Sequence, residues 1–319
     1  MRKENKIANN RVSAAGVQRY HEGGYGSENY AFLGFTGENK YFTSDRFIKL
    51  DENYKRVDGK PVKGYGIEFE LESWGFNSQK AFATVLRDIV FKSFPDGLFK
   101  MQNDCTLDSG TTHGGIEAIT QIMTKEFIRN HYKDFKTMFN EHFDIFDISA
   151  SRSGNCGMHV NISNACFAND EAIRKFYYIV NHHYEFMCAL VARDRSHTAW
   201  CQRMTADKDY CKALDLENMS GNHGNCFNGS HYGVGRIELR LVGGQKTFAC
   251  FRNTMESIFF LIDRAKKISW DDCDDLVKIF KGCNQYVADR IVTMCYDAGT
   301  VTSAQAHEIQ ANMVREELL

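Results

Sequence analysis

The sequence predicts an α+β fold in which a sheet packs helices against one face and keeps the other face polar. Three segments, 66–72, 156–163 and 236–241, alternate apolar and polar residues with the period of a β-strand. Residues i and i+2 of a strand share a face, so each segment has one apolar and one polar face. Helical patterns lie among the strands without regular βαβ alternation, and half-polar strands favour a sheet with one face open to a ligand.

Composition is typical of a folded protein of the reducing interior of a cell. The chain has 319 residues, 43% of them hydrophobic, which is enough for one large domain or two small ones. The formal net charge of −2 argues against a general nucleic-acid binder. No apolar run has the length of a membrane span, and the N-terminus has no signal-peptide core. We expect a soluble, cytoplasmic protein without nucleic-acid or membrane partners; a homo-oligomer is left open.

The cysteines predict free thiols. The chain has eleven, an odd number, at irregular spacings and without a Cys-x-x-Cys pair. A zinc site or a disulfide framework would show paired spacings. Most of the cysteines are expected to be small core residues.

Three regions are expected along the chain. Residues 1–60 form an N-terminal extension, as hairpins or as an arm; 61–267 form the main domain; and 268–319 form a helical extension with Gly282 and Gly299 as helix stops. The polar region 194–231 is expected to be irregular, and a long loop of this kind is usually functional. The remaining expected elements are strand 65–72, helix 78–93, strands 97–102 and 114–122, helix 125–143, a hairpin of strands 144–149 and 156–163, helix 170–192, strand 234–242 and helix 247–267.

The polar faces carry the candidate chemistry. Glu68, Glu70 and Glu72 share one face of their strand. Carboxylates two residues apart, about 6.6 Å, repel by roughly 2 kcal/mol at an effective dielectric constant of about 20, so the ladder needs a cation, for which a divalent metal is suitable. An exposed strand face is the alternative interpretation.

The other two strands have similar alternatives. His159 shares a face with Asn161 and is either structural or a ligand, while Glu238 and Arg240 form either an ion pair or a metal ligand beside a phosphate-binding guanidinium. Glu117 lies in an otherwise apolar strand, where a carboxylate is costly unless it is paired or ligated. Sequence motifs of P-loop, Rossmann, zinc-protease and serine-hydrolase sites do not occur.

In this order the motifs resemble a known family. Gly-x-Glu-x-Glu at 66–70, an Asp before Gly-Gly-x-Glu at 114–117, Cys-Gly-x-His-Val at 156–160 and Ile-Glu-x-Arg at 237–240 are similar to the amidoligase family of the glutamine synthetase and glutamate–cysteine ligase superfamily. The resemblance covers about 64–265. It implies a curved antiparallel sheet with helices on its convex face, cupping Mg²⁺ (or Mn²⁺) and ATP.

The resemblance also implies roles for particular residues. It expects His159, Asn161 and Arg240 to contact the nucleotide, and Arg240, with Arg236 and Arg203, to stabilise the phosphoryl group. The role of Asp104 is left open, and Asn161 stands where the family usually has a second histidine. The expected metal ligands are Glu68, Glu70, Glu117, His159 and Glu238.

The implied activity is an ATP-dependent ligase that joins a carboxylate to an amine through an acyl phosphate. Small molecules or peptides would supply the two groups. A phosphotransferase on the same scaffold is one alternative. A catalytically silent binding or assembly protein that retains the fold is the other.

Overall fold

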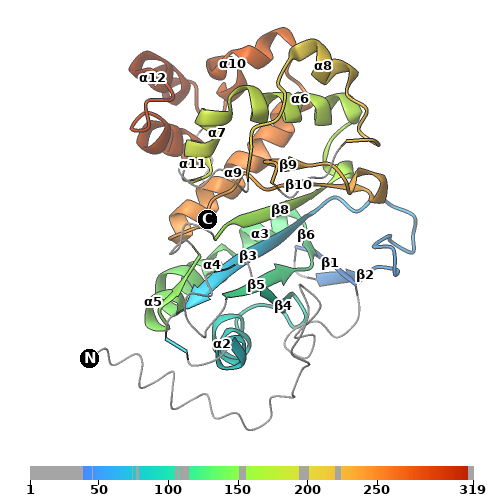
Figure 1. The fold of residues 1–319 in the computed structure, drawn as a ribbon, viewed down its shortest axis with the longest axis vertical. Coiled ribbons are helices and arrows are strands. Elements are labelled where there is room, and N and C mark those ends of the chain that lie inside the picture. Colours follow the sequence, from blue (N-terminus) through green and yellow to red (C-terminus); the bar gives the residue numbers. More distant parts are fainter. Residues whose placement is uncertain are drawn as a thin grey trace. The chain divides into compact units, whose positions relative to one another are not determined.

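The computed structural model describes residues 39–44, 46–73, 75–76, 79–104, 107, 115–150, 156–193, 201–219 and 224–314. In them the chain folds as a mixed α and β protein with mostly antiparallel strands (Figure 1). It divides into two compact units. The first runs to Val160 and includes 244–248, and the second comprises 161–243 and the residues from Ala249 onward. The boundary falls inside strand β8 (Met158–Ser163), which therefore contributes residues to both units.

The sheet of the first unit is organised around β3 (Tyr65–Ser73), which confirms the strand predicted at 65–72. From one edge the strand order is β2-β1-β6-β3-β8, while β5 and β7 also pair with β3, and β4 pairs with β5. Strand β3 is antiparallel to β5, β6 and β7, whereas β1 and β6 run parallel. The other bounds are β1 (Lys40–Thr43), β2 (Arg46–Lys49), β4 (Phe99–Asp104), β5 (Gly115–Thr120), β6 (Ile122–Met123) and β7 (Ile148–Ser149).

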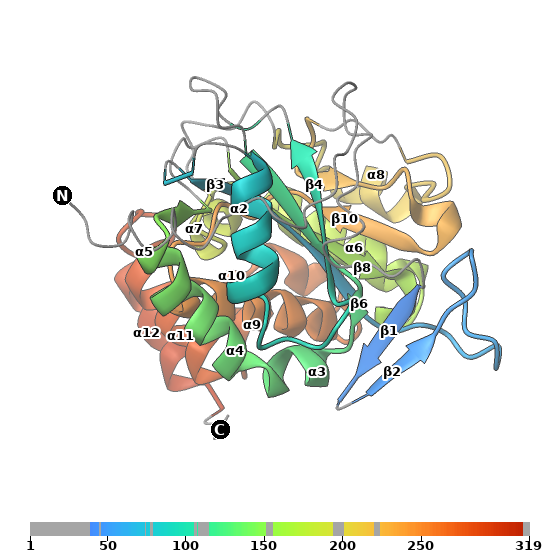
Figure 2. The same ribbon diagram turned by 90° about the horizontal axis from the view of Figure 1, so that it is seen from below.

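The apolar face of β3 packs against helices, as the alternation predicts. Ile67, Phe69 and Leu71 are almost fully buried, and the Phe69 ring lies 6.5 Å from that of Phe135 and 6.2 Å from that of Phe139. Figure 2 shows α2, α3 and α4 on this side of the first unit. The helical segments are α2 (Gln79–Val85), the π-helix η2 (Leu86–Val90), α3 (Lys125–Asn130), α4 (Tyr132–Thr137), the π-helix η3 (Met138–His142) and α5 (Phe143–Ile145).

Two expectations for the first unit need correction. The helix predicted at 125–143 is divided at His131, whose backbone is not helical and whose Nδ1 lies 2.9 Å from the carbonyl oxygen of Phe127. The hairpin of 144–149 with 156–163 is wrong, because 143–145 are helical and β7 pairs with the end of β3. Its expected turn, 151–154, lies outside the described residues. Residues 40–49 form the hairpin β1–β2, one of the two alternatives for the N-terminal region.

The second unit combines a small sheet with most of the helices. Its strand order is β8-β10-β9, with β9 (Phe227–Asn228) antiparallel to β10 (Arg236–Leu239). The helix predicted at 170–192 is two helices, α6 (Asp170–His182) and α7 (Tyr184–Leu190), and the helix predicted at 247–267 is α9 (Phe248–Ala265). The region 194–231 is less irregular than expected, because it contains β9 and α8 (Lys208–Ala213).

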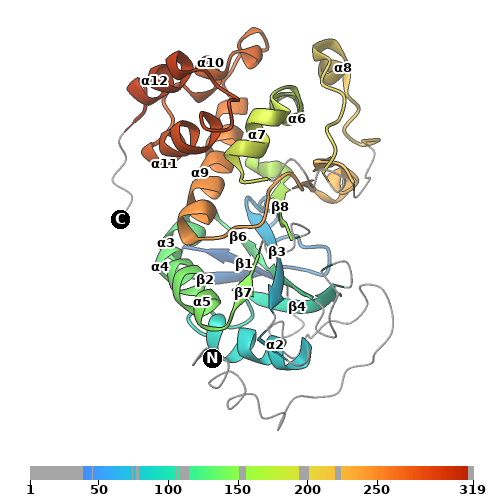
Figure 3. The same cartoon turned by 60° about the vertical axis from the view of Figure 1, so that its left-hand side comes forward.

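The C-terminal residues form short helices, as predicted. They are α10 (Leu276–Phe280), α11 (Gln285–Arg290) and α12 (Ser303–Ala311), which Figure 3 shows grouped together, with the 3-10 helix η7 (Asp271–Asp274) and the π-helix η8 (Ile291–Cys295). Gly282 and Gly299 follow helical segments with φ of +77° and +68°. Such angles favour glycine, which explains why both residues act as helix stops. In the described part of the chain, the helices are all too short or too polar to cross a membrane.

Candidate functional site

The polar face of β3 is more buried than its sequence pattern predicts. Glu68 is partly exposed, but Glu70 is only 8% exposed and Glu72 only 3%. Strand β3 is central in the sheet of the first unit and has neighbours on both sides, so its side chains do not lie on an edge. A buried carboxylate is stable only with hydrogen bonds or an opposite charge nearby. The partners of this face are therefore the key to its chemistry.

His159 of β8 lies between the first two carboxylates. Its Nδ1 is 3.3 Å from an oxygen of Glu68, and its Nε2 is 3.6 Å from an oxygen of Glu70. The side chains of His159 and Glu70 are 8% and 10% exposed, so this contact is shielded from bulk water. The arrangement follows from the strand period, because Glu68 and Glu70 project from the same face toward a neighbouring strand.

Glu117 joins this group from the other side of β3. In the antiparallel register of β3 and β5, Glu70 and Glu117 are direct partners, so their side chains share a face. The side-chain amide of Gln102, on β4, donates to Glu117. The backbone N–H of Gly157 donates to Glu70. We call Glu68, Glu70, Glu117 and His159 the carboxylate group of the first unit.

The carboxylate group has the donor chemistry of a divalent-cation site. Three carboxylates supply hard oxygen ligands, which suit Mg²⁺ and Mn²⁺, and the imidazole adds a nitrogen ligand. His159 Nδ1 is within hydrogen-bond distance of Glu68, whereas the 3.6 Å between Nε2 and Glu70 is too long for a hydrogen bond. Of the first-unit residues that the sequence predicts as ligands, Glu68 and His159 have ligand atoms close enough together to bind one ion.

In the second unit, Glu238 is held by two donors. This residue is 5% exposed, and Arg240 Nη1 donates to its Oε1 over 2.6 Å. Asn228, its direct partner on β9, donates from Nδ2 to Oε2 over 2.9 Å. Ser230 donates from both its backbone N–H and its hydroxyl to the Asn228 side-chain oxygen, which fixes the orientation of that amide. The Glu238 carboxylate thus accepts hydrogen bonds from an amide and from a guanidinium. The sequence allowed either an ion pair or a metal ligand beside a phosphate-binding guanidinium, and the structure contains the ion pair.

The other predicted residues of the second unit lie in different settings. Arg236 is exposed at the start of β10, two residues before Glu238 and on the same face of the strand. Arg203 is also exposed, and its Nε donates to the backbone oxygen of Asn181 over 2.9 Å. Asn161 is buried in the part of β8 that belongs to the second unit. The side chain of Asp104 lies outside the described residues.

Three polar groups that contact the predicted site residues were not predicted from the sequence. Gln102 and Asn228 are amides whose strand registers place them opposite Glu117 and Glu238. The backbone N–H of Gly157 is the third. The alternation of β4 could have indicated Gln102, but β9 is only two residues long within a polar region. Asn228 therefore had no sequence signal.

The buried cysteines Cys188 and Cys211 of the second unit are poor candidates for a nucleophile or a metal ligand. Burial raises the pKa of the Cys188 thiol to about 12, and burial likewise raises the pKa of the Cys211 thiol to about 12. The nucleophile and the metal ligand are thiolates, so thiols with raised pKa values are poor at either task. The described cysteines are free, in agreement with the sequence, and Cys105 lies outside the described residues.

Comparison with known proteins leaves the resemblance untested. No model of a known protein family matches the chain, and no curated protein matches it.

Proposed function

We propose that the protein is an ATP- and Mg²⁺-dependent ligase that joins a carboxylate to an amine through an acyl phosphate. The observation that supports this proposal best is the carboxylate group of the first unit. The imidazole of His159 lies between Glu68 and Glu70, and Glu117 stands opposite Glu70. These are the first-unit residues that the amidoligase resemblance assigns to metal. A glutamine synthetase-like curved sheet is the fold that belongs to this proposal.

The reaction has two steps that balance. A carboxylate oxygen of the acid attacks the γ-phosphorus of ATP, and ADP leaves as the acyl phosphate forms. The amine then attacks the carbonyl carbon, loses a proton and displaces inorganic phosphate, which keeps one oxygen of the original carboxylate. A divalent cation, when bound, would neutralise the charge on the phosphate oxygens.

The carboxylate group would hold that cation in the first unit. Its backbone and amide donors, Gly157 to Glu70 and Gln102 to Glu117, would keep the oxygens oriented before the ion arrives. Carboxylates that are already held in place by hydrogen bonds need less rearrangement to bind an ion than flexible surface carboxylates do.

Arg240, in the second unit, is the residue that the resemblance assigns to the phosphoryl group. The pairing with Glu238 positions its guanidinium and leaves a planar cation suited to phosphate oxygens. Arg236 and Arg203 are exposed and would serve the same anion by charge, and Asn161 would add an amide. The resemblance also assigns Glu238 to the metal, so Glu238→Gln should be compared with the other variants in metal binding.

Calorimetric titration tests the metal and nucleotide binding. Wild-type protein should bind Mn·ATP, and Glu70→Gln or Glu117→Gln should weaken the binding by at least tenfold, which corresponds to about 1.4 kcal/mol. Glu141→Gln, at an exposed position of η3, is the matched control and should bind as the wild type does. If Glu238→Gln has no effect on metal affinity, Glu238 only positions Arg240. If the wild type binds neither Mn²⁺ nor Mn·ATP, the silent binding protein is the better description.

Isotope labelling tests the reaction itself. Acids and amines are first screened for ADP release, and the active acid is then labelled with heavy oxygen in its carboxylate. A ligase transfers one labelled oxygen from the acid to inorganic phosphate. It forms the amide only when the amine is present. A phosphotransferase would instead yield a stable phosphorylated product without amine dependence. Phosphate that carries no label would rule out the acyl phosphate.

A further inference from the structure

Cys250 differs from the other described cysteines in its exposure. It lies in the first turn of α9, an 18-residue helix of the second unit, and is partly exposed. Within the described part of the chain it is the one cysteine that is not buried. Reactive cysteines are usually accessible and lie near positive charge, whereas buried cysteines are inert. Cys250 meets the first condition, so the charges beside it decide its chemistry.

The positive charge beside Cys250 is the guanidinium of Arg290, in α11. Its Nη1 lies 3.7 Å from the Cys250 Sγ, and its Nε donates to the backbone oxygen of Leu190 over 2.9 Å. Arg290 is only 4% exposed, yet its Nη2 has no hydrogen-bond partner among the residues that the structure describes. Buried polar atoms normally have a partner, so one without a partner needs an explanation. The guanidinium thus has an unused donor beside the sulfur of Cys250.

Cys295 shows that Arg290 alone does not make a thiol reactive. Burial raises the pKa of the Cys295 thiol to about 12, although the charge of Arg290 acts in the opposite direction. Cys295 is fully buried, and its Sγ lies 3.8 Å from the backbone oxygen of Phe186. A thiol with such a pKa forms little thiolate, which is the reactive form. Of the two thiols near this guanidinium, Cys250 is the one that a reagent from solvent can reach.

An oxygen atom on the Cys250 sulfur would give the unused donor of Arg290 an acceptor. Nη2 is bonded to the same carbon as Nη1, so an oxygen added to Sγ comes within reach of the guanidinium. The first turn of a helix also carries partial positive charge, which favours an anion there. A sulfenate, the anion of a cysteine with one added oxygen, fits both features.

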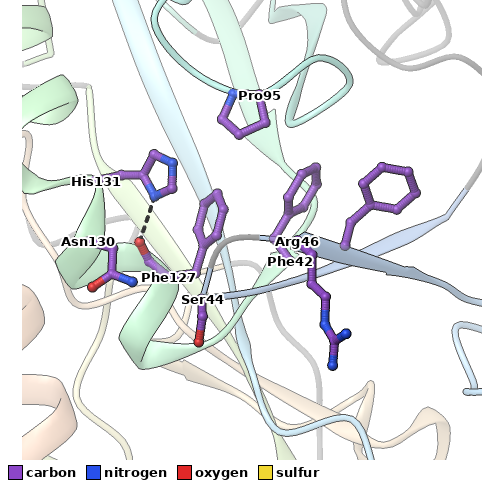
Figure 4. Close-up of a pocket in the computed structure, with 8 residues that line it drawn as sticks. Phe42, Ser44, Arg46, Pro95, Phe127, Asn130 and His131 are labelled. Atoms are coloured by element: carbon purple, nitrogen blue, oxygen red, sulfur yellow. Dashed lines mark hydrogen bonds between the residues drawn. The ribbon is translucent and has the colours of Figure 1, made fainter.

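The hollow beside the hairpin of β1 and β2 offers less to a ligand. Figure 4 shows Phe42 and Phe127 among the residues that line it, and each is only 1% exposed. Their ring centroids lie 5.2 Å apart, and the dashed line in Figure 4 joins His131 Nδ1 to the Phe127 carbonyl oxygen. These groups already pack against one another and leave little surface free. The pair of Cys250 and Arg290 is the stronger candidate for further chemistry.

We propose that Cys250 is a site of reversible oxidation by a hydroperoxide, and that Arg290 stabilises the product. The thiol loses its proton to water, and the sulfur attacks one oxygen of hydrogen peroxide. A sulfur–oxygen bond forms as the oxygen–oxygen bond breaks, and the departing hydroxide takes the proton of the new S–O–H group and becomes water. The sulfur is oxidised by two electrons to the sulfenate, and the peroxide is reduced.

Small thiols reverse this oxidation. One thiol displaces the oxygen as water and forms a mixed disulfide with Cys250, with uptake of one proton. A second thiol then attacks the mixed disulfide, restores the Cys250 thiol and leaves as the small disulfide. The site lies outside the carboxylate group of the first unit and does not depend on the proposed ligase reaction.

Dimedone trapping in the full chain tests the proposal. Reduced protein is treated with equimolar hydrogen peroxide in the presence of dimedone, which reacts with sulfenic acids, and each cysteine peptide is quantified by mass spectrometry. Cys250 should carry at least about tenfold more label than Cys295, because exposure and positive charge both favour oxidation. Cys250→Ser should remove that label. Glu70→Gln, in the first unit, should be labelled as the wild type is, so failure of the metal site leaves this test unchanged.

Two alkylating reagents show whether Arg290 acts by its charge. Iodoacetate is an anion and iodoacetamide is neutral, and both alkylate the same sulfur. Their rate ratio at Cys250 should be at least about threefold higher in the native protein than in the urea-unfolded chain, because the guanidinium attracts the anion. Arg290→Met should abolish this increase and lower the dimedone label, and Arg290→Lys should retain much of both. Lys281→Gln, which removes an exposed positive charge just after α10, should retain both in full.

Three results would overturn the proposal. Cys250 could carry no more dimedone label than Cys295, so that it is not a preferred site of oxidation. The ratio of the iodoacetate rate to the iodoacetamide rate could be the same in the native and the unfolded wild type, so that no positive charge acts on the sulfur. A folded Arg290→Met variant could be labelled as the wild type is, so that Arg290 does not stabilise the product. The first two measurements use the wild type alone, so they decide the proposal even if Arg290→Met fails to fold.

Discussion

Glu70 and Glu117 stand directly opposite each other on the antiparallel strands β3 and β5. Like charges in this position destabilise a sheet, and here one of the two residues is buried. A protein that keeps both carboxylates must offset their charge. Gly157 and Gln102 donate hydrogen bonds to them, and the proposed cation would supply the positive charge. If the proposed cation binds there, its binding would add to the stability of the fold at this pair.

Glu117→Gln should separate these two effects. The variant keeps an oxygen for the Gln102 amide but removes one of the opposed charges, so the metal-free protein should become more stable by about 0.5–1 kcal/mol. It should also lose most of the stabilisation that Mn²⁺ gives to the wild type. Urea unfolding with and without MnCl₂ measures both quantities, and Glu141→Gln serves as the control. A variant that Mn²⁺ stabilises as much as it does the wild type would contradict the proposed site.

Arg240 and Glu238 should show strong coupling in a double-mutant cycle. Arg240→Met leaves a buried carboxylate without its guanidinium and should cost about 3 kcal/mol of unfolding free energy. Adding Glu238→Gln to that variant should recover much of the loss, because the neutral amide no longer needs a cation and Asn228 remains as its partner. Denaturant unfolding of the four proteins gives the coupling energy. Additive single effects would show that the two side chains do not stabilise each other.

His183 should make the protein less stable at mildly acidic pH. Burial lowers the pKa of His183, even though its Nε2–H donates to the carbonyl of Cys273 over 2.9 Å. Because the folded state has the lower pKa, the unfolded chain takes up the proton first as the pH falls below about 6.5. Stability should therefore decrease from about pH 6.5 down to the folded pKa, by at most about 1.4 kcal/mol per pH unit.

His183→Gln is the variant for this test. It should flatten the pH dependence in that window, which urea unfolding at a series of pH values measures. His307→Gln, at an exposed position of α12, is the control and should leave the dependence unchanged. The lowered pKa of Asp274 acts in a separate window, because stability from a carboxylate is lost only as the pH falls below about 4. An unaltered slope in His183→Gln would assign the pH dependence to other groups.

The buried cysteines of the native protein should react slowly with thiol reagents. A thiol with a pKa of about 12 is a thiolate in roughly one molecule in ten thousand at pH 8. Burial raises the pKa to about 12 in four of the described cysteines, Cys188, Cys211, Cys283 and Cys295. A colorimetric thiol titration should count eleven thiols after unfolding and far fewer before it. Fast labelling of Cys211 in the native protein, located by peptide mass, would contradict the predicted burial.

Gly243 should tolerate no side chain. A Cβ at this position would lie 2.1 Å from the carbonyl oxygen of Ala192, a backbone atom that cannot move aside easily. Gly243→Ala should therefore cost about 3 kcal/mol, whereas Ala192→Gly should cost little or stabilise, because Ala192 has a φ of +61°. Thermal unfolding compares the two variants. If both variants lost the same stability, the close approach of Gly243 to the Ala192 carbonyl would not explain the effect of Gly243→Ala.

Strand periodicity predicted the central part of the fold well. The alternation at 65–72 predicted β3 to within one residue and distinguished its two faces, because period-two patterns reflect side-chain direction directly. The same reasoning placed Glu68 and Glu70 together on the polar face of that strand, and His159 on the polar face of another strand. What it could not give is the pairing of strands far apart in sequence. That pairing brought Glu117 opposite Glu70 and sent β7 to β3 rather than to a hairpin.

Burial was the main property that the pattern misjudged. A polar face reads as exposed from its residues alone, yet Glu72 is 3% exposed, since its surroundings come from other parts of the chain.

The passage of β8 from one unit to the other restricts how the gene can be divided. A fragment that stops at Val160 lacks the second half of that strand and the returning residues 244–248, both of which the chain supplies only after a long excursion. Neither unit corresponds to one continuous stretch of coding sequence. Expression of isolated halves is therefore expected to give incomplete strands, and ribosomal synthesis must proceed past residue 248 before the first unit has all of its parts.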